Sequence, residues 1–313
     1  MTITLAGGSG FLGRALADRF TATSHTVRIL TRRAQPGSST FVAWQPNGTT
    51  GPWATTFADT DVVINLAGEG ISDKRWTPAR KQVLRDSRIL PTRSLVRALA
   101  EAPPRPRLFI NISAIGIYGA HGDEPVTEQT PPGDDFLARL CVEWEREASA
   151  AASAETHVAL VRTGIVLHPK GGALTSMLPP FRMGIGGPMG TGRQYMSWIH
   201  LDDWIALVEW LVTKSATAPA APAGHKNLTA WNATAPHPVT NAEFARALGR
   251  MLHRPAIMPI PGFALRLLLG EFATFLLTGA RVIPERAELA GFRFRYPELQ
   301  PALASLLSPG LTM

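Results

Sequence analysis

The feature that most constrains the fold of this chain is a glycine-rich turn near its N-terminus. Residues 2–6 form a short apolar run with β-branched side chains, which is typical of a buried strand. Gly7, Gly10 and Gly13 follow with the spacing G-x-x-G-x-x-G, and residues 11–20 carry apolar side chains at helical spacing. A strand, a glycine turn and a helix in this order predict a Rossmann-type nucleotide-binding unit.

The three glycines have distinct expected roles in such a turn. Gly7 allows the sharp turn out of the strand, Gly10 lets the backbone approach a pyrophosphate, and Gly13 lets the helix pack closely on the sheet. The helix that follows would present free N–H groups and the positive end of its dipole to the phosphates. The alternative interpretation is a glycine-rich turn that holds no ligand.

The residues after the second predicted strand indicate which dinucleotide would bind. A strand over residues 26–31 is followed by Arg32 and Arg33, where the NAD fingerprint has an acidic residue for the ribose 2′-hydroxyl. Arginine offers a planar, permanently charged group that is suited to phosphate. We therefore expect NADP(H) rather than NAD(H), and the alternative is that both arginines are ordinary surface charges.

Strands and helices alternate through the first half of the chain. Further strands are expected over residues 61–66, 107–113 and 156–167, and helices over residues 77–100 and 134–152. This alternation predicts an α/β fold in which a Rossmann-like, doubly wound parallel sheet carries helices on both faces.

The second half of the chain has a different texture. Residues 171–193 are rich in glycine and proline and are predicted to form a long binding loop. A helix is expected over residues 241–253. We expect an NADP(H)-binding domain over residues 1–168, which a later strand near 226–232 rejoins, and a smaller, mostly helical, substrate-side domain over residues 169–313.

Composition argues against several classes of function. The net charge is +7, but the basic residues are scattered, so a nucleic-acid partner is not expected. The single cysteine, Cys141, cannot build a disulfide framework, and the eight histidines show no metal-ligand spacing, so no metal site is expected. No signal peptide is recognised, and charged residues interrupt the apolar stretch 263–280; we therefore expect a cytoplasmic protein without a membrane partner.

An ordered set of motifs indicates a family. The chain resembles the extended short-chain dehydrogenase/reductases, and more closely their atypical nucleoside-diphosphate-sugar epimerase-like branch with a C-terminal domain of unknown function. The motifs that carry the resemblance are Gly7–Gly13, Asn65–Gly68, Arg75–Thr77, Ser87–Ile89, Ser113–Gly119, Pro132–Leu137, Trp144–Glu145, Gly184–Pro188, Ser197–Asp203, Arg254–Pro255 and Leu268–Glu271.

The resemblance implies that NADP(H) is the cofactor and assigns residues to it. The glycine turn would hold the diphosphate, the two arginines the 2′-phosphate, and the end of the third clear strand the adenosine and ribose. Arg88 is similar to a cofactor-contacting arginine of the branch, and a surface salt bridge is its alternative role. The implied set comprises Gly7, Gly10, Phe11, Leu12, Gly13, Arg32, Arg33, Leu66, Ala67, Gly68, Arg88 and Ser113.

The catalytic pattern of that family is broken in this chain. Active members use Ser, Tyr and Lys, with Tyr as the general acid/base and Lys four residues later to lower its pKa. Ser113 is in place at the end of a strand, but Leu137 stands where Tyr belongs and Cys141 where Lys belongs. No Tyr-x-x-x-Lys occurs anywhere in the sequence. Tyr118 and His200 are the remaining candidates for the proton donor.

Two functions therefore stay open. The first is an NADP(H)-dependent oxidoreductase of the sugar-epimerase-like type, acting on a small molecule for which a nucleotide sugar is one candidate. The second is a non-catalytic NADP(H)-binding protein that reads redox state or serves partners as a scaffold. A homodimer is an open assembly state in either case.

Overall fold

The computed structural model describes residues 1–33, 37–101, 105–217 and 227–308, and a seven-stranded sheet forms its centre. The strand order is β11-β7-β5-β4-β1-β2-β3, and every neighbouring pair is parallel. The order reverses beside β1, which makes the carboxyl ends of β1 and β4 a switch point where such sheets bind ligands. The strands are β1 (Thr2–Ala6), β2 (Thr26–Thr31), β3 (Phe41–Ala43), β4 (Val62–Asn65), β5 (Leu108–Ala114), β7 (His157–Thr163) and β11 (Leu228–Ala233).

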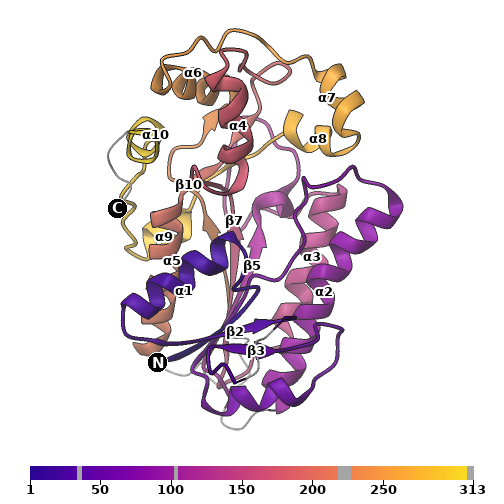
Figure 1. Ribbon diagram of the computed structural model, residues 1–313, viewed down its shortest axis with the longest axis vertical. Coiled ribbons are helices and arrows are strands. Elements are labelled where there is room, and N and C mark those ends of the chain that lie inside the picture. Colours follow the sequence, from indigo (N-terminus) through magenta and orange to yellow (C-terminus); the bar gives the residue numbers. More distant parts are fainter. Residues whose placement is uncertain (34–36, 102–104, 218–226, 309–313) are drawn as a thin grey trace.

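Helices cover both faces of this sheet, as Figure 1 shows. On one face, α1 (Phe11–Ala22) and α5 (Leu201–Thr217) share an apolar core with β1 and β5. On the other face, α2 (Pro78–Glu101) and α3 (Phe136–Ser149) cover the sheet, and a 3-10 helix (Pro52–Asp59) packs beside them. The central strands are apolar on both sides because both faces are covered. The predicted doubly wound α/β fold is confirmed.

The later part of the chain forms a helical region above the carboxyl ends of the strands (Figure 1). A third apolar core joins α4 (Gly172–Arg182), α6 (Asn241–Met251) and α10 (Leu299–Leu307) through Trp198, Phe244 and Leu303. The shorter elements are β6 (Pro125–Val126), β8 (Ile165–Leu167), β9 (Tyr195–Met196), β10 (Trp198–His200), β12 (Val239–Thr240), β13 (Arg281–Val282), α7 (Gly262–Leu269), α8 (Phe272–Leu277) and α9 (Glu285–Leu289).

The expectation of a continuous loop over residues 171–193 is wrong for its first half, which forms α4. Leu174, Leu178 and Phe181 recur at helical spacing and are buried in the third core. Pro179 and Pro180 remove two N–H groups, but the residues four positions earlier are exposed, so water can satisfy their carbonyl groups. Burial of one apolar stripe therefore outweighs the proline content.

The expected strand 156–167 is divided in two at Gly164. A Cβ at Gly164 would lie 2.5 Å from the carbonyl oxygen of Ser197, so the close approach of β10 requires a glycine there. The apolar stretch 263–280 holds α7 and α8, separated by Gly270 with a φ of +64°. Among the helices in the described ranges, none has the length and apolar character that a membrane span requires.

Candidate functional site

The glycine turn between β1 and α1 is built by close backbone approach. Gly7 has a φ of +80°, and a Cβ there would lie 2.8 Å from the carbonyl carbon of Leu66. A Cβ at Gly13 would lie 2.5 Å from the carbonyl oxygen of Gly7 and 2.5 Å from the Cα of Gly8. Both positions therefore need glycine for the turn to seat against the end of β4.

Gly10 is different, because space remains around it. It is the N-cap of α1 with extended backbone, and a Cβ there would meet only the carbonyl oxygen of Gly7, at 3.4 Å. No side chain caps α1, and its first turn holds no acidic residue. The free N–H groups of this turn and the open space at Gly10 fit the phosphates of a dinucleotide.

Arg32 and Arg33 follow β2 and are both exposed. Among the described residues, neither guanidinium makes a hydrogen bond or an ion pair. The backbone N–H of Arg33 donates to the Oγ1 of Thr31 at 3.3 Å, which holds the chain at the end of the strand. Two cations without counter-charges beside the glycine turn are suited to a phosphate.

Leu66, Ala67 and Gly68 continue from β4 beside that turn. The N–H of Ala67 donates to the Oδ1 of Asn65 at 3.1 Å, and the buried Asn65 amide donates to Asn111 at 2.8 Å. These bonds fix the course of the chain after β4. Gly68 is exposed, and a Cβ there would lie 3.3 Å from the Cζ of Arg88.

Arg88 is a deeply placed cation without a carboxylate partner among the described residues. Its guanidinium donates to the carbonyl oxygens of Leu84 and Glu69, each at 3.0 Å, and its Cζ lies 5.4 Å from the centre of the Trp144 ring. Burial lowers the pKa of Arg88, because the charged form loses hydration. A partly buried cation of this kind is stabilised by an anionic or strongly polar ligand.

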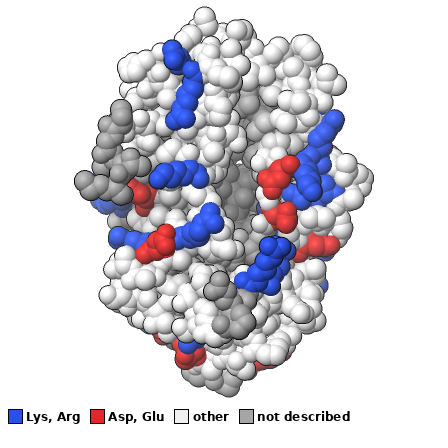
Figure 2. Space-filling view, in the orientation of Figure 1, with Lys and Arg blue, Asp and Glu red and all other residues white. Residues whose placement is uncertain are grey.

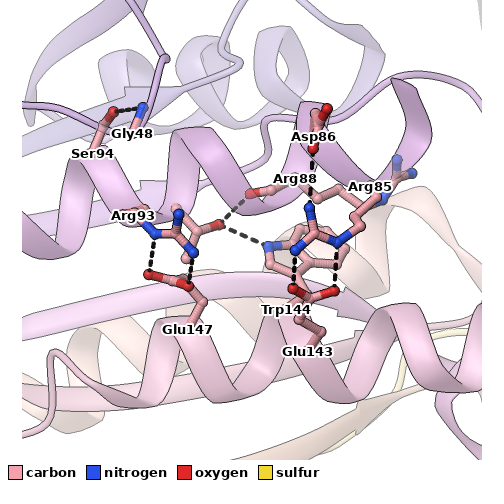
Figure 3. A network of polar contacts seen from close by, with 10 residues as sticks. Gly48, Arg85, Asp86, Arg88, Arg93, Ser94, Glu143, Trp144 and Glu147 are labelled. Carbon is pink, nitrogen blue, oxygen red and sulfur yellow. Dashed lines mark hydrogen bonds and ion pairs between the residues drawn. The ribbon is translucent and has the colours of Figure 1, made fainter. Parts of the chain in front are cut away.

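Two ion pairs join α2, which carries Arg88, to α3, as Figure 3 shows. Arg85 of α2 pairs with Glu143 of α3, and Arg93 pairs with Glu147 through bonds of 3.0 and 2.8 Å. Between them, the Oγ1 of Thr92 accepts from the Nε1 of Trp144 at 2.9 Å and donates to the Arg88 carbonyl at 2.7 Å. On this part of α2, the surface salt bridges are therefore made by Arg85 and Arg93 rather than by Arg88.

Ser113 lies at the end of β5 and is buried in a polar network. Its Oγ donates to the Oε1 of Glu145 at 2.8 Å. Arg162, the register partner of Ser113 on β7, binds both carboxylate oxygens of Glu145 at 3.0 and 2.9 Å. The Ser113 hydroxyl proton is therefore engaged inside the protein.

Tyr118 belongs to the same network and is fully buried. Its hydroxyl donates to the Oδ1 of Asn232 at 2.7 Å and accepts from the Nη1 of Arg162 at 2.9 Å. Burial raises the pKa of Tyr118, and the Arg162 charge offsets part of that effect. The phenol is a neutral structural group that ties β11 to β7.

His200 ends β10 and is buried outside this network. Its Nδ1 accepts from the N–H of Asp202 at 3.0 Å, its Nε2 lies 3.1 Å from the Ser305 hydroxyl, and its ring stacks on Tyr296 at 4.0 Å. Burial lowers its pKa to about 4, so the ring is neutral near pH 7. Its contacts dock α10 and the segment before it.

Leu137 and Cys141 lie one turn apart on the buried face of α3. Leu137 lies close to Gly116, just beyond β5: a Cβ added at Gly116 would be 3.4 Å from the Cβ of Leu137. Burial raises the pKa of Cys141 to about 12, and the Glu145 charge adds to this effect. Neither side chain can exchange a proton near neutral pH.

The structure thus brings Ser113 and Tyr118 together through Glu145 and Arg162, and the described contacts do not join His200 to them. The sequence analysis assigned no role to Glu145, which lies in one of the family motifs, and it missed Arg162. The available signal was a charged residue inside an apolar strand pattern at Arg162. In the described residues, no group of acidic, histidine and cysteine side chains could hold a metal ion.

Comparison with known proteins supports the resemblance. Residues 3–223 match the NAD dependent epimerase/dehydratase family, and residues 260–306 match a domain of unknown function, DUF1731. An epimerase family protein of Mycobacterium bovis is 42% identical over 96% of both chains. An Arabidopsis thaliana relative, described as chloroplastic, is 38% identical over 98% of this chain and 87% of its own. The cytoplasmic location of the present chain stays a prediction.

The solved structures give the same result. The crystal structure of human epimerase family protein SDR39U1, solved with NADPH, covers 98% of this chain and 99% of its own at 32% identity, with a TM-score of 0.87. MoeE5 in complex with UDP-glucose and NAD has a TM-score of 0.73 at 18% identity over 98% of this chain and 97% of its own, which shows the shared fold alone. The present chain belongs to the NAD dependent epimerase/dehydratase family and carries the C-terminal DUF1731 domain.

Proposed function

We propose that this chain is an NADP(H)-dependent oxidoreductase that works without the tyrosine–lysine pair of its family. The observation that carries the proposal is the uncapped, acid-free start of α1 beside two arginines that have no counter-charge among the residues the structure describes. The first turn of α1 would hold the diphosphate, Arg32 and Arg33 the 2′-phosphate, and the segment from Leu66 to Gly68 the adenosine side. The human relative, whose crystal structure contains NADPH, supports this choice of cofactor.

NADPH, when bound, supplies a hydride. Arg88 would add a fixed positive charge at the base of the site, because it lies against Gly68 and near Cys141, where the family has its lysine. The proton that accompanies a hydride would come from water or from the substrate, because Tyr118 and His200 are both held by internal hydrogen bonds. Ser113 would act as a positioning residue through Glu145.

The substrate would lie on the side formed by residues 169–313, which we propose as a second domain next to the 1–168 domain. The segment between β8 and α4 already reaches the glycine turn: the His168 ring lies 5.7 Å from the Phe11 ring, and Gly171 packs on Phe11. Relatives named for nucleotide sugars make these one candidate substrate class.

A second function has its own supporting observation. The hydroxyl groups of Ser113 and Tyr118 and the imidazole of His200 are engaged in internal hydrogen bonds, and Leu137 and Cys141 are buried. A protein of this kind would hold NADP(H) without turning it over and would act through partners.

Two measurements separate these functions. Fluorescence titration with NADPH and NADH tests the cofactor, and we expect NADPH to bind at least about tenfold more tightly because of the phosphate contacts. Equal affinities would contradict the cofactor assignment. Oxidation of bound NADPH is then followed with aldehydes, ketones and nucleotide sugars. Turnover with any of them favours the oxidoreductase, and none with all of them favours the reader or scaffold.

A further inference from the structure

An exposed apolar rim lies far along the chain from the glycine turn. Of the twelve large apolar side chains that are exposed in the described part of the chain, seven belong to two short segments. Leu267 is 78% exposed, Phe263 73% and Ile257 84%. The apolar rim consists of Met183, Ile185, Ile257, Met258, Phe263, Leu267 and Leu268.

Backbone contacts hold these two segments side by side. The N–H of Gly190 donates to the carbonyl of Ile260 at 2.9 Å, and the N–H of Ile260 donates to the carbonyl of Pro188 at 2.8 Å. The Nε of Arg254 donates to the carbonyl of Arg182 at 3.1 Å. In Figure 1 the chain between α6 and α7 crosses the end of the molecule that lies farthest from β2 and β3. The rim is therefore one surface at this end.

The charge around the rim is mostly positive, and the neighbouring Glu271 is paired with Lys81. Residues 171–201 and 244–270 contain no aspartate or glutamate. Arg182, Arg254 and Arg266 lie within or beside the rim, and in the part of the chain that the structure describes none of them pairs with a carboxylate. Figure 2 shows the upper part of this face white and blue, with the red side chains only lower down.

We infer that the apolar rim docks on an anionic lipid bilayer surface. Exposed Phe, Leu, Ile and Met side chains flanked by arginines, with the neighbouring Glu271 paired to Lys81, match an interface that is apolar beneath a negatively charged layer. A second copy of the chain fits less well, because a two-fold contact would bring the same arginines face to face. This mode of contact needs no membrane span.

Vesicle sedimentation of the full-length chain tests the inference. We expect binding to phosphatidylglycerol-containing vesicles and little binding to pure phosphatidylcholine, with weaker binding as salt is raised. The double variant F263S/L267S should lower the bound fraction about tenfold or more, because two apolar side chains no longer insert. R182E/R266E should also lower binding by at least about fivefold for each arginine.

Matched variants control for surface chemistry and folding. Leu289 is 82% exposed outside the rim, so L289S should leave vesicle binding unchanged; Arg97 is exposed on α2, and R97E should likewise change it little. Thermal unfolding and NADPH titration of each variant report whether the fold is kept. No binding to anionic vesicles by the wild type would overturn the inference. A dimer in light scattering that F263S/L267S dissociates, without vesicle binding, would assign the rim to a second copy.

Discussion

Along the carboxyl edge of the central sheet, polar groups lack partners at one end and are hydrogen-bonded to one another at the other end. We call the part beside β1 and β2 the open end. There, among the described residues, no side chain caps the first turn of α1, and the guanidiniums of Arg32 and Arg33 have no counter-charge. We call the part beside β5 and β7 the closed end. There, Ser113 and Tyr118 take part in an internal hydrogen-bond network with Glu145 and Arg162. Groups without partners indicate a place for a ligand, and satisfied groups indicate structure. This difference supports our proposal that the chain keeps the binding half of its family's site, while the network beside β5 and β7 stabilises the fold.

The largest effect is expected from breaking the closed end. Glu145→Ala leaves the buried Arg162 guanidinium without its counter-charge, which should cost about 3–5 kcal/mol of unfolding free energy. Glu143→Ala, on the same helix but in a half-exposed pair with Arg85, should cost less than about 1 kcal/mol. Denaturant unfolding measures both. Equal losses would contradict a special role for the buried pair.

The next effect concerns the open end. Gly10→Val should lower NADPH affinity at least about a hundredfold, because its side chain fills the space expected for the pyrophosphate. Its stability should change little, since the Gly10 backbone is already extended and uncrowded. Gly13→Val should lose both binding and stability, because its Cβ overlaps the glycine turn. Titration and thermal unfolding separate the two variants, and normal binding by Gly10→Val would move the site elsewhere.

A smaller effect is expected on the preference for NADPH over NADH. Arg32→Asp combined with Arg33→Ala should lower NADPH affinity by about tenfold or more and leave NADH affinity within about threefold, because one charge-assisted phosphate contact is worth about 1.5–3 kcal/mol. Arg97→Ala is the matched surface control. An equal loss for both dinucleotides would mean that the arginines do not read the 2′-phosphate.

The smallest expected effect is a dependence of stability on pH. The pKa of His200 falls from 6.5 to about 4 on folding, so the unfolded chain binds a proton that the folded chain excludes between these values. This contribution is complete above about pH 6.5 and is lost progressively as the pH drops toward 4; at pH 5.5 the loss is about 1.4 kcal/mol. His200→Gln should flatten that part of the stability profile. An unchanged slope between pH 7 and pH 5 in that variant would contradict this assignment.

The open end could be predicted from sequence because its determinants are local. The strand, the three glycines, the helix and the two arginines follow one another within the first 33 residues. The closed end could not be predicted, because Ser113, Glu145 and Arg162 come from three elements and meet only through strand register and helix packing. The helix α4 was missed for a related reason: local glycine and proline content opposed it, and burial of Leu174 and Phe181 in a distant core decided the outcome.

The central claim is that the site binds NADP(H) and that no side chain takes over the proton transfer of the family's tyrosine. Its most direct test is the rate at which the NADPH complex is oxidised by the best carbonyl substrate, in the wild type beside Ser113→Ala, Tyr118→Phe and His200→Ala. We predict slow but measurable oxidation of the bound cofactor, with each variant that remains folded within about threefold of the wild type. General acid–base catalysis contributes about 10²–10⁴-fold. Brisk oxidation that Tyr118→Phe or His200→Ala lowers by at least about a hundredfold, with NADPH affinity and folding unchanged, would contradict the claim.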